Sequence, residues 1–127
     1  MSSYIWHLRF ANTMIKIAED ELHKNKYVTI NSILKAFEEI IDAYCALSNL
    51  HFHEDPTTGW KNRIEWIKDK SLYREWKKMI DLIDLFFKNK SDEYIIEIIS
   101  IAKKNINNLE IYHNKINDKF CSTNTKL

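Results

Sequence analysis

Apolar and small residues recur every three or four positions along most of this chain, which is the period of an amphipathic helix. The first such stripe predicts a helix from Ser3 to about Asn25. It consists of Leu8, Ala11, Ile15, Ala18 and Leu22.

A broader apolar set follows and predicts a second helix that contacts several neighbours. Thr29 or Asn31 can cap its start. We expect it to stop near Phe52, because the residue before Pro56 is disfavoured in the α region. The set is Ile30, Ile33, Leu34, Phe37, Ile40, Ile41, Tyr44, Cys45, Leu47 and Leu50.

Glycine and proline occur once each, and both fall within residues 55–59. Turns draw heavily on these two residues, so a chain nearly without them has little material for hairpins or a many-stranded sheet. We therefore expect a loop at residues 55–59 and helices almost everywhere else.

Three further helical patterns follow this segment. A short one spans residues 60–70, and a long one begins at an N-cap Ser71 and ends near residues 88–90. Another starts after Ser91, with acidic residues in its first turn that favour a helix N-terminus. Their apolar positions are Trp60, Ile64 and Ile67; Leu72, Trp76, Met79, Ile83 and Phe86; and Ile95, Ile98, Ala102, Ile106, Leu109, His113 and Ile116.

These patterns predict an all-α fold, an up-and-down four-helix bundle with an extra short helix. A chain of 127 residues is typical of one domain, which we assign to residues 1–120, with a flexible tail at residues 121–127. No apolar run approaches the ~20 residues that a membrane span requires, so we expect a cytoplasmic protein without membrane contact. The two cysteines lack metal-ligand spacing and suit a reducing compartment.

The net charge of +1 is unevenly distributed. Residues 27–58 carry one lysine against five acidic residues, whereas residues 59–90 carry nine Lys and Arg against five. The basic block also carries aromatic residues, and this mixture is typical of single-stranded nucleic acid binding, where cations offset phosphate charge and rings stack on bases. The alternative is a solvated helix face with buried tryptophans. The candidate binding residues are Trp60, Lys61, Arg63, Trp66, Lys68, Arg74 and Lys77.

Histidines supply the remaining candidate chemistry. His51 and His53 precede two acidic residues, and they are weak candidates for a divalent metal site, because side chains two apart on a helix diverge. Glu110 and His113 have the Glu-x-x-His spacing of di-iron bundles, although the other ligands of such a site are missing. A core or subunit-interface histidine is the simpler interpretation of His113. No glycine-rich phosphate loop or nucleophile elbow is present, and we expect no cofactor.

One family resembles this layout. The first helix ends at residues 19–22, Lys26-Tyr27 follows, and the next helix carries an alanine-containing run at residues 33–47 with His51 or His53 shortly after it. This arrangement resembles the HEPN superfamily of small prokaryotic helical domains. The resemblance covers about residues 8–110, and it implies a homodimeric helical bundle.

The family divides by activity, and the resemblance implies two possibilities. Ribonuclease members use an arginine with a histidine four to six positions later, and this chain has no such pair, although His51 and His113 remain weak catalytic candidates. Other members are non-catalytic partners of nucleotidyltransferases. We therefore expect a non-catalytic domain that binds a nucleotide, RNA, or a protein such as a nucleotidyltransferase or antitoxin. The alternatives are a toxin-type ribonuclease and a purely structural dimerisation module.

Overall fold

A computed structural model describes residues 3–48, 50 and 56–125, and it contains five helices and no strand within these ranges. The helices are α1 (Ser3–Glu21), α2 (Lys26–Ala46), α3 (Pro56–Ile67), α4 (Ser71–Asn89) and α5 (Asp92–Thr125). The prediction of an all-helical bundle with one short extra helix is confirmed at this level. Within the described residues, no helix combines the length and apolar character needed to cross a membrane.

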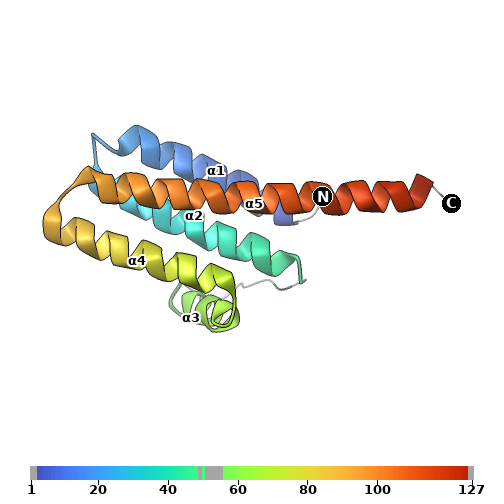
Figure 1. The fold of residues 1–127 in the computed structure, drawn as a ribbon. Helices are drawn as coiled ribbons and strands as arrows, with labels where there is room; N and C mark the ends of the chain where they lie inside the picture. The colour runs from blue at the N-terminus through green and yellow to red at the C-terminus, as the bar shows by residue number, and fades with distance from the viewer. Residues whose placement is uncertain (1–2, 49, 51–55, 126–127) are drawn as a thin grey trace.

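The four long helices run roughly along one axis, and α3 lies across them beside one end of α4 (Figure 1). The most extensive packing joins α1 to α2, and α5 packs against α1, α2 and α4. At 34 residues α5 is the longest helix, and it projects beyond the other four (Figure 1). It stays helical to Thr125, whereas the sequence predicted a tail from residue 121.

The apolar stripes that the sequence predicted form the core. Every residue of the predicted α1 stripe is buried, and α2 buries residues around most of its circumference, as expected for a central helix. In α4, Leu72, Met79 and Phe86 are buried, while Trp76 and Ile83 are half-buried against them. One helix face therefore reaches the core in α1 and α4, whereas the central helix α2 is covered on most sides.

Helix boundaries differ from the predicted ones where a cap was misassigned. Asn25, rather than Thr29 or Asn31, caps α2, since its side-chain oxygen accepts hydrogen bonds from the backbone N–H groups of Tyr27 and Val28. Thr29 is instead buried, and its hydroxyl donates to the carbonyl oxygen of Asn25. The helix ends at Ala46, six residues before the expected stop.

The expected loop at residues 55–59 is largely helical. Pro56 is the first residue of α3, a position that favours proline because its missing N–H would have no intrahelical partner there. Gly59 lies inside the helix and is buried. At α4, Lys70 is the N-cap and Ser71 the first helical residue.

Candidate functional site

The residues predicted to bind nucleic acid do not share one surface. Lys61, Lys68, Arg74 and Lys77 are exposed, as the prediction requires. Trp60 and Trp66, the two candidates for stacking on bases, are half-buried against the core. They also line different pockets: Trp66 lines one of about 550 Å³, and Trp60 lines a mainly apolar one of about 370 Å³.

Arg63 lies in the interior. Its Nε donates to Asp42 Oδ1 at 2.6 Å and its Nη2 to Asp42 Oδ2 at 3.0 Å, and Nη2 also lies 3.3 Å from Glu38 Oε1. The side chain is 6% exposed. This bidentate pair occupies the donors that a phosphate would need, so the placement of Arg63 does not suit the predicted phosphate contact. The arginine instead fixes the short helix α3 to α2.

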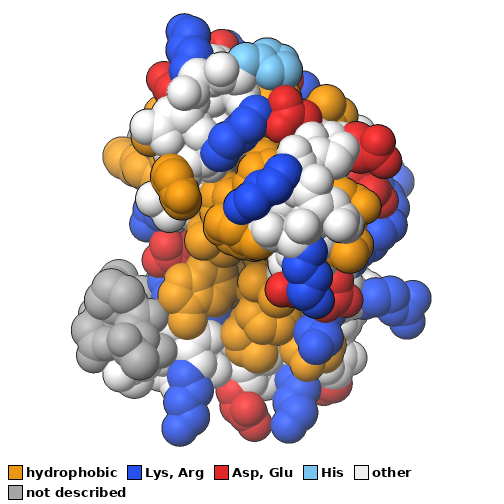
Figure 2. Space-filling view, turned by 90° about the vertical axis from the view of Figure 1, so that its left-hand side faces the viewer, with side chains coloured by type: hydrophobic (Ala, Val, Ile, Leu, Met, Phe, Trp, Pro, Cys, Tyr) orange, Lys and Arg blue, Asp and Glu red, His pale blue; other side chains and the backbone are white. Residues whose placement is uncertain are grey.

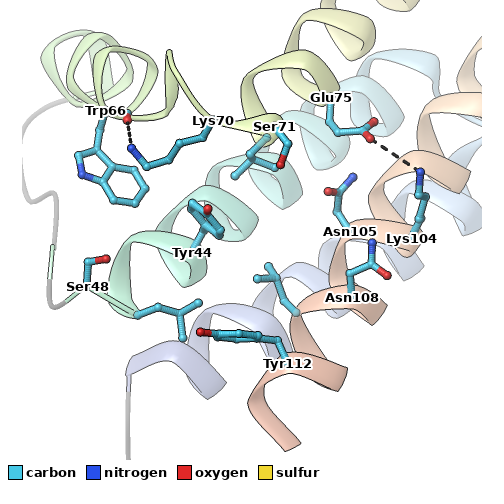
Figure 3. A pocket seen from close by; sticks show the side chains of 13 residues that line it. Tyr44, Ser48, Trp66, Lys70, Ser71, Glu75, Lys104, Asn105, Asn108 and Tyr112 are labelled. Atoms are coloured by element: carbon cyan, nitrogen blue, oxygen red, sulfur yellow. Dashed lines mark hydrogen bonds and ion pairs between the residues drawn. The ribbon is translucent and has the colours of Figure 1, made fainter. Parts of the chain in front are cut away.

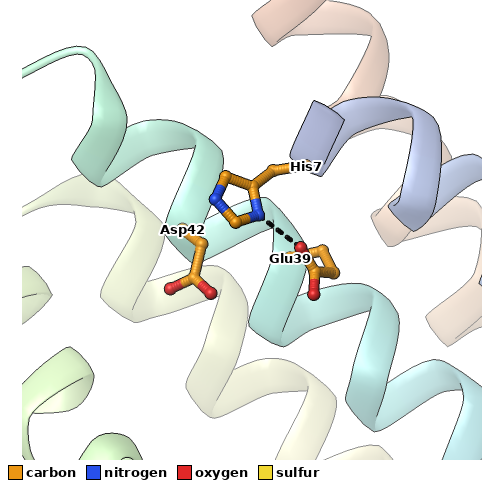
Figure 4. Close-up of side chains that lie close together, drawn as sticks. All are labelled: His7, Glu39 and Asp42. Atoms are coloured by element: carbon orange, nitrogen blue, oxygen red, sulfur yellow. Dashed lines mark hydrogen bonds and ion pairs between the residues drawn. The ribbon is translucent and has the colours of Figure 1, made fainter. Parts of the chain in front are cut away.

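A histidine from α1 extends this network. His7 Nδ1 lies 2.5 Å from Glu39 Oε2, and Lys35 Nζ lies 3.2 Å from the other oxygen of Glu39. His7 and Asp42 approach Glu39 from α1 and from the next turn of α2 (Figure 4). We call the six residues His7, Lys35, Glu38, Glu39, Asp42 and Arg63 the buried ion-pair network. When His7 is protonated, its three cations balance its three carboxylates.

The network shifts the pKa values of its central pair. The hydrogen bond to Glu39 raises the pKa of His7, and this effect outweighs the opposing effect of burial. Burial acts to raise the pKa of Glu39, but the contacts with His7 and Lys35 outweigh it and lower that pKa. Both shifts favour the charged pair.

The same network contains the one described group of potential metal ligands, His7, Glu39 and Asp42. Both oxygens of Asp42 already accept from Arg63, and both oxygens of Glu39 are paired with cations. An added metal ion would have to displace these partners, so the geometry fits an ion-pair network better than a metal site. The metal candidates that the sequence offered, His51 and His53, lie outside the described residues.

A pocket with a volume of about 550 Å³ is formed by the end of α2, the α3–α4 connection and α5. We call it the main pocket. Its lining residues are Tyr44, Leu47, Ser48, Trp66, Lys70, Ser71, Leu72, Glu75, Lys104, Asn105, Asn108, Leu109 and Tyr112. The volume falls within the range of small-molecule sites in proteins.

The main pocket has two chemically different sides (Figure 3). The aromatic side consists of Tyr44 and Trp66, and Trp66 packs edge-on against Tyr44 at 5.5 Å between ring centroids. A third ring, that of Tyr112, lies on α5 one turn beyond Asn108. Across from Trp66 lies the polar side, defined by the four residues Glu75, Lys104, Asn105 and Asn108 (Figure 3). An aromatic surface opposite amides and a cation can hold a flat ring and a polar substituent of one ligand.

Local helix geometry explains both sides. Trp66 follows Arg63 by one helical turn, so the Arg63 ion pair holds the part of α3 that carries it. Lys70 closes that end, since its Nζ donates to the carbonyl oxygen of Trp66 at 2.9 Å and lies 4.2 Å from the centroid of the indole ring. On α5, positions 104, 108 and 112 stand one turn apart, so their side chains share one flank.

The charged pair on the polar side is loose. Glu75 Oε1 and Lys104 Nζ lie 3.8 Å apart, and the lysine side chain is 68% exposed whereas the glutamate side chain is 27% exposed. Such a pair contributes little to stability in water, so its groups are available to a ligand.

His113 lies on the other flank of α5. It lines a smaller pocket of about 330 Å³ with Ile5, Leu8, Arg9, Glu110 and Asn114, and its ring lies 4.9 Å from that of Tyr4. Glu110 is exposed and accepts a hydrogen bond from Asn12. Since Glu110 does not point into the bundle, the arrangement does not fit the inward ligand set of a di-iron site.

Sequence reasoning missed most of the main pocket. Among the pocket residues, it selected Trp66 as a candidate for binding but not Tyr44, Lys104, Asn105, Asn108 or Tyr112. One sequence pattern could have indicated the pocket. Lys104, Asn108 and Tyr112 follow one another at one-turn intervals beside the apolar stripe of α5.

Comparisons with known proteins add no assignment. The sequence matches no protein-family model, and searches of curated proteins and of solved structures found no similar protein. The HEPN resemblance, the homodimer and the protein partners therefore stay predictions.

Proposed function

We propose that this protein is a non-catalytic, HEPN-like helical domain that binds a nucleotide, free or as a unit of an RNA chain, in the main pocket. The observation that carries this proposal is the composition of a single 550 Å³ pocket, where the rings of Tyr44 and Trp66 face two amides and a lysine and the ring of Tyr112 lies one turn along α5. It retains the predicted ligand class and moves its site away from the basic face of residues 61–77.

The aromatic side supports binding of a base. Every nucleobase has a flat π face, and base–aromatic stacking contributes about 1–3 kcal/mol per base. Trp66 and Tyr44 are held by their mutual edge contact, and Trp66 also by Lys70, so little side-chain entropy remains to be lost on binding.

The polar side supports binding of the sugar and phosphate. Lys104 is mostly exposed, and its ion pair with Glu75 is long enough that a phosphate oxygen can replace it as the closer anion. Asn108 offers two donors and one acceptor beside it, and Asn105, whose Nδ2 donates to the carbonyl oxygen of Ile101 at 2.9 Å, adds a second donor and an acceptor. On the exposed basic face, by contrast, acidic residues alternate with the cations. Figure 2 shows one end of the molecule, where Lys and Arg side chains are likewise mixed with Asp and Glu around a hydrophobic area.

The proposal is tested by isothermal titration calorimetry with AMP and with a single-stranded RNA tetramer. We expect Lys104→Ala to weaken binding about tenfold, because it removes one charge-assisted hydrogen bond. Lys78→Ala is the matched control, since Lys78 is also an exposed lysine in a long ion pair, with Glu97 at 3.6 Å, but outside the pocket. No heat with either ligand, or equal losses in both variants, would contradict the proposal.

Comparing AMP with the RNA tetramer distinguishes a site for a free nucleotide from a site for one unit of an RNA chain. If RNA is the ligand, the tetramer binds more tightly than AMP, and its affinity falls steeply with salt because several phosphates are neutralised. Similar affinities for AMP and the tetramer indicate a free nucleotide.

A ribonuclease is the second candidate function, and one observation favours it. Arg9 from α1 and His113 from α5 line the same small pocket, which joins an arginine and a histidine that the sequence separates widely. In this case the tetramer would be cleaved during the titration, and His113→Ala would abolish the cleavage.

A further inference from the structure

The polar side of the main pocket contains a group that does not suit a phosphate. Glu75 is the one carboxylate among the lining residues, and its side chain is largely buried at the first turns of α4. An ionised carboxylate only accepts hydrogen bonds, so it repels phosphate oxygens and needs a donor from the ligand.

A nucleotide offers such donors at two places, the ribose hydroxyls and the amino groups of some bases. The position of Glu75 distinguishes between them. It lies beside Lys104, the phosphate contact of the proposed function, whereas Trp66 is on the opposite side of the pocket (Figure 3). The sugar lies between base and phosphate in any nucleotide, so the carboxylate next to the phosphate contact meets the ribose.

We infer that Glu75 accepts hydrogen bonds from the ribose 2′- and 3′-hydroxyls, so that the main pocket selects ribonucleotides over 2′-deoxyribonucleotides. This inference rests on the proposed function and names its ligand class. Acidic residues recognise the ribose 2′-hydroxyl in dinucleotide-binding folds by the same chemistry. The 2′-hydroxyl is also the group by which a protein distinguishes RNA from DNA.

The ion pair with Lys104 fits this role. A lysine at 3.8 Å lies beside the carboxylate without occupying it through a short hydrogen bond. Ligand binding then replaces one long contact by two short ones, with the phosphate on Lys104 and the hydroxyls on Glu75.

The test measures the affinities of AMP, dAMP, GMP and dGMP for the wild-type protein and for two variants. Glu75→Gln keeps the shape of the side chain and removes its charge. Glu65→Gln is the matched control, since Glu65 is an exposed glutamate on α3 that lines a different pocket. Circular dichroism and thermal unfolding verify that both variants fold like the wild type.

We expect the wild type and Glu65→Gln to bind the ribonucleotides about tenfold more tightly than their deoxy forms, as for one hydrogen bond to a charged acceptor. In Glu75→Gln this ratio falls toward one. Glu75→Gln also removes the ion-pair partner of Lys104, which can strengthen the binding of a phosphate. Adenosine and 2′-deoxyadenosine have no phosphate, so their affinity ratio reports on the 2′-hydroxyl alone.

The possible results are distinguishable. Equal wild-type affinities for ribo and deoxy forms, or a ratio unchanged in Glu75→Gln, overturn the role of Glu75 and leave the proposed function standing. A preference for both guanine nucleotides over both adenine nucleotides that disappears in Glu75→Gln assigns the carboxylate to the base and also overturns the inference. Absence of binding by all four nucleotides contradicts the proposed function, and the inference falls with it.

Discussion

The buried ion-pair network and the polar side of the main pocket are built from similar residues, yet they differ in the distances between their charged atoms and in the exposure of their side chains. In the network, Arg63 and Asp42 form a bidentate pair at 2.6 and 3.0 Å with about a tenth or less of either side chain exposed. In the pocket, Glu75 and Lys104 lie 3.8 Å apart and face a cavity. Charged residues that already satisfy one another hold a fold together, whereas loosely paired ones remain free to bind a ligand.

The largest expected effect comes from breaking the network. Arg63→Met leaves the buried carboxylate of Asp42 without its bidentate partner, and we expect it to lower the free energy of unfolding by about 3–5 kcal/mol. Urea unfolding measures this loss. The exposed Arg74→Met is the control and should change stability by less than about 0.5 kcal/mol.

A double variant makes this test sharper. Replacing both partners, with Asp42→Leu and Arg63→Met, removes the buried charges together, so much of the lost stability should return. If Arg63→Met alone is as stable as Arg74→Met, then the arginine is not a structural anchor, and its predicted role in binding regains support.

A smaller effect is expected from pH. The pKa of His7 is raised, so its contribution to stability is complete below the unfolded-state histidine pKa of about 6.5 and is lost as pH rises through the higher folded-state value. The pKa of Glu39 is lowered, so its contribution is present above about 4.3 and is lost as pH falls through the lower folded-state value. Asp42 and Arg63 also face His7, with opposite effects on its pKa.

We therefore expect the pair to contribute fully between about pH 4.3 and 6.5, by on the order of 1 kcal/mol. Urea unfolding at pH 6 and pH 9 measures the loss at high pH. His7→Gln should flatten this dependence, whereas His23→Gln, at a histidine whose side chain is 77% exposed, should retain it. An unchanged slope in His7→Gln would show that the pair does not stabilise the fold.

The sequence was sufficient to predict the helices because their burial follows a local period. The predicted α1 stripe is buried at every position, since a residue's place on a helix face depends only on its neighbours along the chain. Helix starts were harder to predict. Asn25, Thr29 and Asn31 are all acceptable caps, and the choice depends on how α1 packs against α2.

The site could be predicted only in part, because it depends on contacts between distant segments. Arg63 looked like a phosphate contact, since the sequence does not show that Asp42, 21 positions earlier, lies beside it. Trp66 was predicted as a nucleic-acid contact of the basic face, whereas in the structure it lines the main pocket with Tyr44 from α2 and Tyr112 from α5. Residue type predicted the chemistry, and only the packing of helices showed which side chains meet.

The most direct measurement is a ¹H–¹⁵N NMR titration of the protein with AMP, which reports on pocket, network and basic face together. We expect the chemical-shift changes to cluster at the Trp66 indole and at the side-chain amides of Asn105 and Asn108, while the Arg63 Nε–H resonance stays in place. Changes centred on the basic face around Lys68 and Lys77, or no changes at millimolar AMP, would contradict a nucleotide site in the main pocket.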